Sequence, residues 1–374
     1  MSTKSYWRKY GSLTVGATML ILSAVVVLPN ASSASGTGIP AAQAALKKLE
    51  IRPTKIPVTT PVAKHIPGSK TIDFVVCGVP QCAILTGPLE AAAADLGWTV
   101  DTVPGGLTPE TVLDAWNQVV QNKPDAAVAT GFPEVLFSAP LATLASEHIP
   151  VVNGFVTDTS GNGVAAIVNG APAYTKAGGA LANFVLGTDG TTAHADFIGS
   201  TTFPASGFEE NAFKARYAAL CPSCKIGSID EPSTITQADL TAGIVAAVTA
   251  DPTINYIVCS SPTDAYGLPQ ALSAAGFTHV KILVNTPDAT TLTYLKQGLI
   301  TGIIDTPNTD VMAEFIDALA RSFTGQSVAV DQTAGSDWAV TKATASQVVY
   351  PYHLVNGFLK QYEALWNAKK PKKK

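Results

Sequence analysis

The stretch TIDFVVCGVPQCAILTGPLEAAAADLGWTVDTV, residues 71–103, decides the fold. Its first seven residues form the continuous apolar run of a buried strand, and residues 98–103 form a second strand. Between them, the Ala-rich segment 87–96 has the composition of a helix that ends at Gly97. A strand, a helix and a second strand in succession predict a βαβ unit with parallel strands.

The alternation of strands and helices continues after residue 103. Thr108 is an N-cap residue followed by Pro109, and this pair predicts a helix to about Asn122. We predict further strands at 126–130, 149–153, 195–198, 225–229, 256–259, 281–284 and 301–305, and further helices at 133–146, 174–186, 208–220, 237–249, 266–275 and 292–297. The pattern restarts once, near residue 174. It therefore predicts an α/β fold in which two doubly wound parallel-sheet lobes are joined by a hinge.

Composition and charge narrow the function classes. The 374 residues are 47% apolar and 14% charged, which excludes disorder over most of the chain. Residues 71–359 hold nine basic and 26 acidic residues, a formal charge of −17. A body this acidic excludes nucleic acid as a partner, because nucleic-acid-binding faces are basic. It also disfavours strongly anionic ligands.

Both ends of the chain differ from this body. Residues 1–34 have the basic start, apolar run and small-residue end (ASSA) of a signal peptide, with cleavage expected after Ala34. We therefore expect an exported protein, periplasmic or extracellular. A retained membrane anchor is the alternative, because the apolar run is slightly long for a signal. Residues 35–70 are interpreted as a Pro-rich linker with a short helix, and residues 367–374 as a solvated basic tail.

Five short segments follow one another along the body: KPDAA at 123–127, HIPVV at 148–152, DPTINY at 251–256, AYGLPQAL at 265–272 and QGLITG at 297–302. Together they resemble the type I periplasmic binding proteins, particularly the sugar-binding branch that includes the ribose-binding proteins. The resemblance covers nearly all of 71–359. It implies a first lobe from 71–171 and 307–335, and a second lobe from 172–306 and 336–366.

The resemblance also implies how such a protein works. The two lobes would close like a hinge on a small molecule, and the receptor would deliver that molecule to the permease subunits of an ABC importer. We expect a monomer that has no cofactor and no metal. A sensory ectodomain or accessory receptor with the same clamshell fold is the first alternative, and a hydrolase or redox enzyme is the second.

The ligand loops depart from those of a sugar site. Where the family often has an Asp-Arg pair, this chain has Phe155 and Val156, so the charged clamp is largely lost. Aromatic and polar residues occupy these loops, and we predict as ligand-binding residues Gln81, Cys82, Phe132, Phe155, Phe203, Phe208, Ser261, Tyr266, Asn285 and Asp305. For each aromatic residue, core packing is the alternative. Such a site suits a neutral or cationic ligand with an apolar or aromatic face, and a sugar remains open.

The five cysteines are consistent with export. Cys221 and Cys224 follow a predicted helix, and we predict a structural disulfide between them, with a redox motif or half a zinc site as alternatives. Cys77 and Cys82 flank a ligand loop and either bridge or stay free. Cys259 is predicted to be a core thiol.

No catalytic constellation is visible in the sequence. None of the five histidines has metal-ligand spacing to another, and neither a nucleophile elbow nor a phosphate-binding loop is present. The pair Glu209–Glu210 is interpreted as the solvated start of a helix, where carboxylates suit the helix dipole. We therefore expect a binding protein without catalysis.

Overall fold

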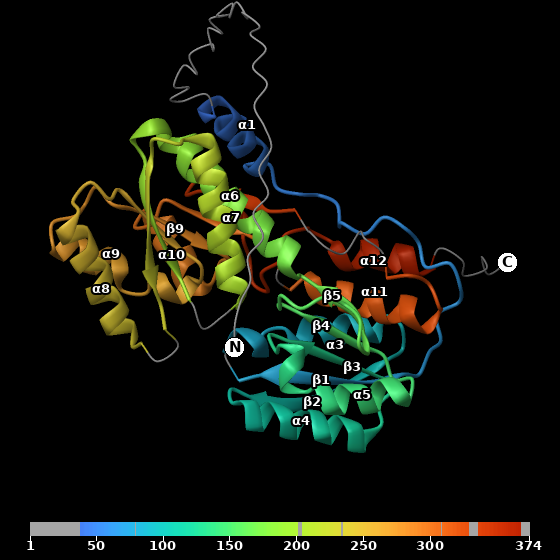
Figure 1. Cartoon of the computed structure of the whole chain (residues 1–374). Helices are drawn as coiled ribbons and strands as arrows, with labels where there is room; N and C mark the ends of the chain where they lie inside the picture. Colours follow the sequence, from blue (N-terminus) through green and yellow to red (C-terminus); the bar gives the residue numbers. More distant parts are fainter. Residues whose placement is uncertain are drawn as a thin grey trace, which may run out of the picture. The chain divides into compact units, whose positions relative to one another are not determined.

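The computed structural model describes residues 38–78, 80–200, 204–232, 235–307, 309–328 and 336–367. They hold two sheets dominated by parallel strands, with helices on both faces of each (Figure 1). This arrangement confirms the predicted α/β fold of two doubly wound lobes. The predicted signal peptide and most of the basic tail lie outside the described residues. Within those residues, no helix combines the length and the apolar character that crossing a membrane requires.

The first lobe is built on a five-stranded sheet of order β2-β1-β3-β4-β5, in which all neighbours are parallel. Its strands are β1 (Thr71–Cys77), β2 (Thr99–Gly106), β3 (Ala126–Thr130), β4 (Val151–Gly154) and β5 (Val164–Val168). Its helices are α2 (Pro80–Ala83), α3 (Thr86–Ala94), α4 (Pro109–Asn122), α5 (Ser138–Ser146) and α11 (Val311–Phe323). Alternate side chains of β1 serve opposite faces: Phe74 packs with α3 and α11, and Val75 packs with α4 and α5.

The second lobe repeats this plan in the order β7-β6-β8-β9-β10, with β11 added antiparallel at the edge. Its strands are β6 (His194–Gly199), β7 (Lys225–Asp230), β8 (Tyr256–Cys259), β9 (Lys281–Asn285), β10 (Gly302–Asp305) and β11 (Trp338–Val340). Its helices are α6 (Ala171–Asp189), α7 (Pro204–Leu220), α8 (Gln237–Ala250), α9 (Leu268–Ala274) and α10 (Ala289–Gln297). Helices α6 and α7 pack together on one face, and the other three cover the opposite face (Figure 1).

The C-terminal segment divides between the lobes. Strand β11 joins the second sheet, but α12 (Phe358–Asn367) packs against α11 of the first lobe. Trp366 is 5% exposed there, and its Nε1 donates a hydrogen bond to Asp317 at 2.9 Å. The sequence interpretation places all of 336–366 in the second lobe. The structure differs because α12 buries its aromatic side chains, Tyr362 and Trp366, on α11.

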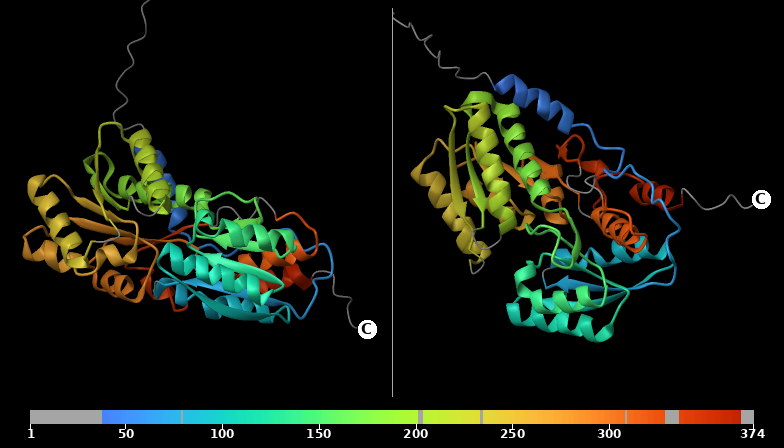
Figure 2. Two further views of the ribbon diagram at one scale, coloured as in Figure 1. Left: turned by 60° about the horizontal axis from the view of Figure 1, so that its bottom comes forward. Right: turned by 45° about the vertical axis from the view of Figure 1, so that its right-hand side comes forward.

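The segment expected to be a linker also packs on both lobes. Helix α1 (Ile39–Leu49) lies along α6, where the side chain of Leu46 contacts Gly187. Residues 52–67 then run to the first lobe, where the Val62 amide donates to the Leu365 carbonyl at 3.1 Å (Figure 2). We call residues 38–67 the N-terminal strap. It packs because apolar side chains alternate with its prolines; those of Ile56, Val58 and Val62 are at most 7% exposed.

Candidate ligand-binding site

A cavity of about 670 Å³ lies at the carboxyl ends of the strands of both sheets. Its walls come from the segments that follow β1, β3, β4 and β5 in the first lobe, and β6, β7, β8, β9 and β10 in the second. Open parallel sheets bind ligands beyond the carboxyl ends of their strands, at the point where the strand order reverses. The volume is in the range typical of small-molecule sites. Position and size therefore mark this cavity as the candidate site.

The wall contributed by the first lobe is uncharged. Cys82 forms a disulfide with Cys77, which ties helix α2 to the end of β1. The Thr130 hydroxyl lies 3.8 Å from the Cys82 sulfur, so the end of β3 contacts this bridge. Ile84 and Leu85 follow on the same wall. The disulfide that the sequence left open is thus part of the cavity's frame.

Phe155 is the aromatic residue of that first wall. It is half-buried, and its ring stacks on Phe315 with centroids 6.5 Å apart. Its backbone has φ of 55°, in the left-handed region that non-glycine residues seldom adopt. Asn169 and Thr286, which also line the cavity, have φ of 51° and 64°. Left-handed non-glycine residues cluster at functional sites, and these three residues surround one cavity.

The wall contributed by the second lobe carries carboxyl groups, foremost Glu209 on α7. Only 2% of Glu209 is exposed, and burial raises the pKa of its carboxyl well above the usual value, against an opposing hydrogen bond from Asn285. Gly178 on α6 makes this placement feasible, because a Cβ there would overlap the Glu209 carbonyl oxygen. A close approach of α6 and α7 therefore holds Glu209 at the cavity.

Two further carboxyl groups on this wall have protein partners. Asp288 caps α10 by accepting the Thr291 amide at 2.7 Å, and it also accepts a hydrogen bond from the Tyr266 hydroxyl. Glu231 hydrogen-bonds to Asp264, and burial raises the pKa of both carboxyls. The carboxylates of Asp288 and Glu231 therefore already have hydrogen-bond partners within the protein.

Asp337 is the fourth carboxyl group of this wall, and it is 7% exposed. Burial raises its pKa to about 7, and the charge of Lys176 opposes the rise. Within the described residues, three buried oxygens of the wall lack a hydrogen-bond partner: Oδ2 of Asp337, Oε1 of Glu209 and Oδ1 of Asn285. Each of these oxygens can accept a hydrogen bond, so ligand groups that donate hydrogen bonds fit this wall.

Comparison with known families agrees with this geometry. The family described as "Periplasmic binding protein domain" matches residues 86–327. The chain belongs to this periplasmic binding protein family. No protein of curated function matches the sequence. Solved structures of low sequence identity share the fold of this binding protein.

Three of those structures show the extent of the likeness. GanP, a glucose-galactose binding protein from Geobacillus stearothermophilus, has 19% identity and a TM-score of 0.63, over 74% of this chain and 99% of its own. An ABC transporter periplasmic solute binding protein from Actinobacillus succinogenes 130z, with bound D-allose, has 14% identity and a TM-score of 0.65, over 75% and 100%. A chain of the XylFII–LytSN complex has 16% identity and a TM-score of 0.62, over 74% and 99%.

The binding protein brings four of the predicted ligand residues to the cavity wall: Cys82, Phe155, Ser261 and Asn285. Tyr266 does not line the cavity itself, but its hydroxyl donates a hydrogen bond to the wall residue Asp288. Three others lie elsewhere: Phe132 is buried in the core of the first lobe, Phe208 is 43% exposed on α7, and Asp305 is buried at the end of β10. Phe203 is outside the described residues, and the side chain of Gln81 is not described.

Sequence reasoning missed several wall residues: Tyr174, Glu209, Glu231, Asp337 and Tyr352. The interpretation of Glu209 as solvated is wrong, since the side chain is buried at the cavity, whereas its neighbour Glu210 pairs with Lys214 at 2.7 Å. Only the rotation of α7 distinguishes the two glutamates. That rotation is set by the packing of α7 on α6, which the local sequence does not reveal.

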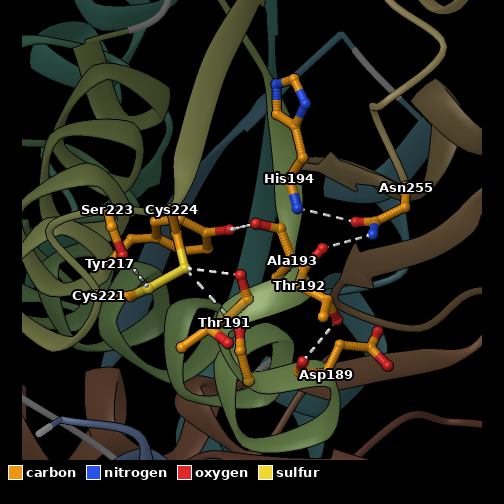
Figure 3. The surroundings of a disulfide bond; sticks show 11 residues. Asp189, Thr191, Thr192, Ala193, His194, Tyr217, Cys221, Ser223, Cys224 and Asn255 are labelled. Atoms are coloured by element: carbon orange, nitrogen blue, oxygen red, sulfur yellow. Dashed lines mark hydrogen bonds between the residues drawn. A yellow bond between two sulfur atoms is a disulfide. The ribbon is translucent and has the colours of Figure 1, made fainter. Parts of the chain in front are cut away.

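The second disulfide lies away from the cavity. Cys221 and Cys224 are bonded, as predicted, in the turn from α7 to β7 (Figure 3). The Cys221 amide donates to the Tyr217 carbonyl at 2.9 Å, and the Tyr217 hydroxyl donates to the Ala193 carbonyl at 2.9 Å. This turn is at the amino end of β7, so the disulfide lies at the opposite end of the strands from the cavity. Cys259 is a buried free thiol, and the described residues contain no group of side chains suited to a metal.

Proposed function

We propose that this chain is an extracytoplasmic solute-binding protein of an ABC importer. It captures a sugar or a small, partly apolar metabolite in the 670 Å³ cavity and performs no catalysis. The observation that carries the proposal is that cavity, built from the strand ends of both lobes in a member of this family. Structures with the same fold include a glucose-galactose binding protein and a solute binding protein with bound D-allose, which supports the ligand class.

Hinge closure is the second part of the proposal. The chain passes from the first sheet to the second after β5 and returns after β10 into α11, so few segments join the lobes. Ligand contacts from both walls would favour the closed arrangement. Small-angle scattering should show a smaller radius of gyration when ligand is added. An unchanged radius at saturating ligand would contradict closure.

A thermal-shift screen of residues 35–374 tests ligand capture directly. The library contains sugars, polyols, aromatic acids, amines and neutral apolar metabolites. A ligand that binds the folded state raises the melting temperature by mass action, by an amount that grows with its concentration. At least one class should produce such a shift. A library without any shift would overturn the proposal of small-molecule capture.

Export is tested at the N-terminus, where residues 1–34 have the signal-peptide pattern. N-terminal sequencing of the protein from its native host should begin at Ser35. A mature protein that begins at residue 1 and sediments with membranes would instead show a retained anchor.

A second candidate function is that of a sensory or accessory receptor. The match to a chain of the XylFII–LytSN complex favours it, because a protein of this fold occurs there in a complex with another protein. Deletion of the gene separates the two candidates. Loss of ligand uptake supports the importer, whereas intact uptake with a lost response to the ligand supports the receptor.

A further inference from the structure

The charged side chains among the described residues that line the cavity are all acidic. Among the described residues that line it, four are acidic, and none is Lys, Arg or His. The internal stretches outside the description, 79, 201–203, 233–234, 308 and 329–335, contain no basic residue in the sequence either. The charge of Lys176, an exposed residue of α6, acts on Asp337. A ligand in this cavity therefore meets negative or neutral groups.

The buried oxygens of Glu209, Asn285 and Asp337 that lack a hydrogen-bond partner indicate the ligand's chemistry more closely than the sign of the charge does. Glu209 accepts a hydrogen bond from Asn285, and the charge of Asp337 acts on Glu209, so the three side chains interact at one wall of the cavity. Each is at least nine-tenths buried, and each has an oxygen without a partner in the described residues. Buried acceptors without partners are costly, so a group of three implies a ligand that donates several hydrogen bonds.

The remaining lining residues indicate the chemistry of the part of the ligand that does not bind these acceptors. Phe155, Tyr174 and Tyr352 present aromatic side chains, and Ile84 and Leu85 present aliphatic ones. Aromatic faces attract cations as well as apolar groups. An ammonium group, with three donors and a positive charge, satisfies the acceptors and matches the sign of the wall.

We infer that the cavity binds a small organic amine in its protonated form, with the ammonium group at Glu209, Asp337 and Asn285 and the apolar or ring-shaped body against Phe155, Tyr174 and Tyr352. This inference rests on the proposed function and narrows its ligand class. Burial raises the pKa of the Glu209 and Asp337 carboxyls, and a neighbouring ammonium charge would favour their ionised form.

Matched ligand pairs test the inference by isothermal titration calorimetry at pH 7.5. Glucosamine is compared with glucose and N-acetylglucosamine, and cyclohexylamine is compared with cyclohexanol. The amine of at least one series should bind about tenfold or more tightly than its neutral partners, because it gains charge-assisted hydrogen bonds. Neutral partners that bind as tightly as the amines, or more tightly, would overturn the inference while leaving the proposed solute-binding function intact.

Variants identify the site. Glu209→Gln and Asp337→Asn should each reduce the preference for the amine to about onefold to threefold while neutral compounds still bind. Glu210→Gln is the matched control on the same helix, because Glu210 pairs with Lys214 and does not line the cavity. If Glu209→Gln fails to fold, as judged by circular dichroism, Asp337→Asn carries the test. An amine preference that survives both folded substitutions would overturn the assignment.

The same measurements distinguish a failure of the amine inference from a failure of the solute-binding proposal. If neither the matched pairs nor the wider screen yields any bound compound, both the amine inference and the solute-binding proposal fail. If only neutral compounds bind, the amine inference fails alone.

Discussion

The two lobes share a strand order but present different chemistry to the same cavity. Each sheet follows the same parallel order, with the second strand of the lobe placed outside the first. The first lobe contributes Cys82, Phe155 and other uncharged residues, whereas the second contributes Glu209, Glu231 and further carboxyl groups. A shared frame therefore does not determine recognition. The segments after the strands do so, and here they give one lobe the apolar contacts and the other the charge.

The largest expected effect tests how the charged wall is held. Gly178→Ala should lower the free energy of unfolding by about 2–3 kcal/mol, because its Cβ would overlap the backbone of Glu209. Urea denaturation measures the change. Gly179→Ala is the matched control, since its Cβ would meet nothing within 4 Å, and it should be stabilising by about 0.5–1 kcal/mol. Equal stabilities of the two variants would show that α6 and α7 do not need this contact.

The next effect concerns the uncharged wall. Phe155→Ala should weaken ligand binding about tenfold, because the ligand loses an aromatic contact, while the melting temperature of the unliganded protein changes little. The control is Phe132→Leu, which should lower the melting temperature and leave affinity unchanged, since Phe132 is buried in the lobe core. Titration and thermal melts of both variants measure this. The opposite pattern would place Phe132, and not Phe155, at the site.

A smaller effect follows from the raised pKa values of the second wall. In the unfolded chain, Glu209 and Asp337 titrate near pH 4, but in the folded protein burial raises the pKa of both, to about 7 for Asp337. Between these pH values the folded state holds protons that the unfolded state has released, so stability falls as pH rises. The melting temperature of the unliganded protein should drop by about 3 °C between pH 5 and pH 8.

Removing each of these carboxyl groups should reduce the pH dependence, to which other buried carboxyls with raised pKa values, such as Asp264 and Glu314, also contribute. Asp337→Asn and Glu209→Gln abolish the titration, although Lys176 near Asp337, and Asp264 and Tyr174 near Glu209, continue to act on the site. Melts of each variant from pH 5 to pH 8 measure the slope. A slope equal to that of the wild type would locate the titrating groups elsewhere.

The smallest effect compares the two disulfides. Replacing Cys77 and Cys82 by Ser should weaken ligand binding about threefold, because the bridge holds α2 at the cavity wall. Replacing Cys221 and Cys224 by Ser should leave affinity unchanged, because that bridge lies at the opposite sheet edge. Each double variant should lose about 2 kcal/mol of stability, the low end for a disulfide, since the loops that these bridges close are short. Calorimetric affinities of the two double variants decide the point, and equal losses of affinity would contradict it.

Sequence reasoning succeeds where the signal is local. The strand predicted at 71–77 is observed as β1 with the same bounds, since a continuous apolar run is its own signal. The helix after Thr108 forms as predicted, with the Thr108 side chain accepting the Thr111 amide as a cap. The lobe architecture follows from the order of such elements.

Sequence reasoning fails where distant segments decide the outcome. Glu209 and Glu210 are neighbours of the same type, and the packing of α7 on α6 buries one and exposes part of the other. Phe132 follows a strand as a wall residue would, yet the contacts in the lobe core hold it inside. Asp305 is the one carboxylate among the predicted ligand-binding residues, whereas Asp337, which follows a stretch without clear periodicity, lines the cavity.

The N-terminal strap has a consequence for the order in which the protein is completed. Its helix α1 is synthesised early, but α6 begins only at Ala171 and α11 only at Val311. At roughly 5–20 residues per second, the strap waits on the order of ten seconds for its first partner and longer for its second. Until then, its apolar side chains are open to chaperones and proteases. The strap can therefore dock fully only on a complete chain, and we expect chains truncated before α11 to be cleaved by proteases near their N-terminus.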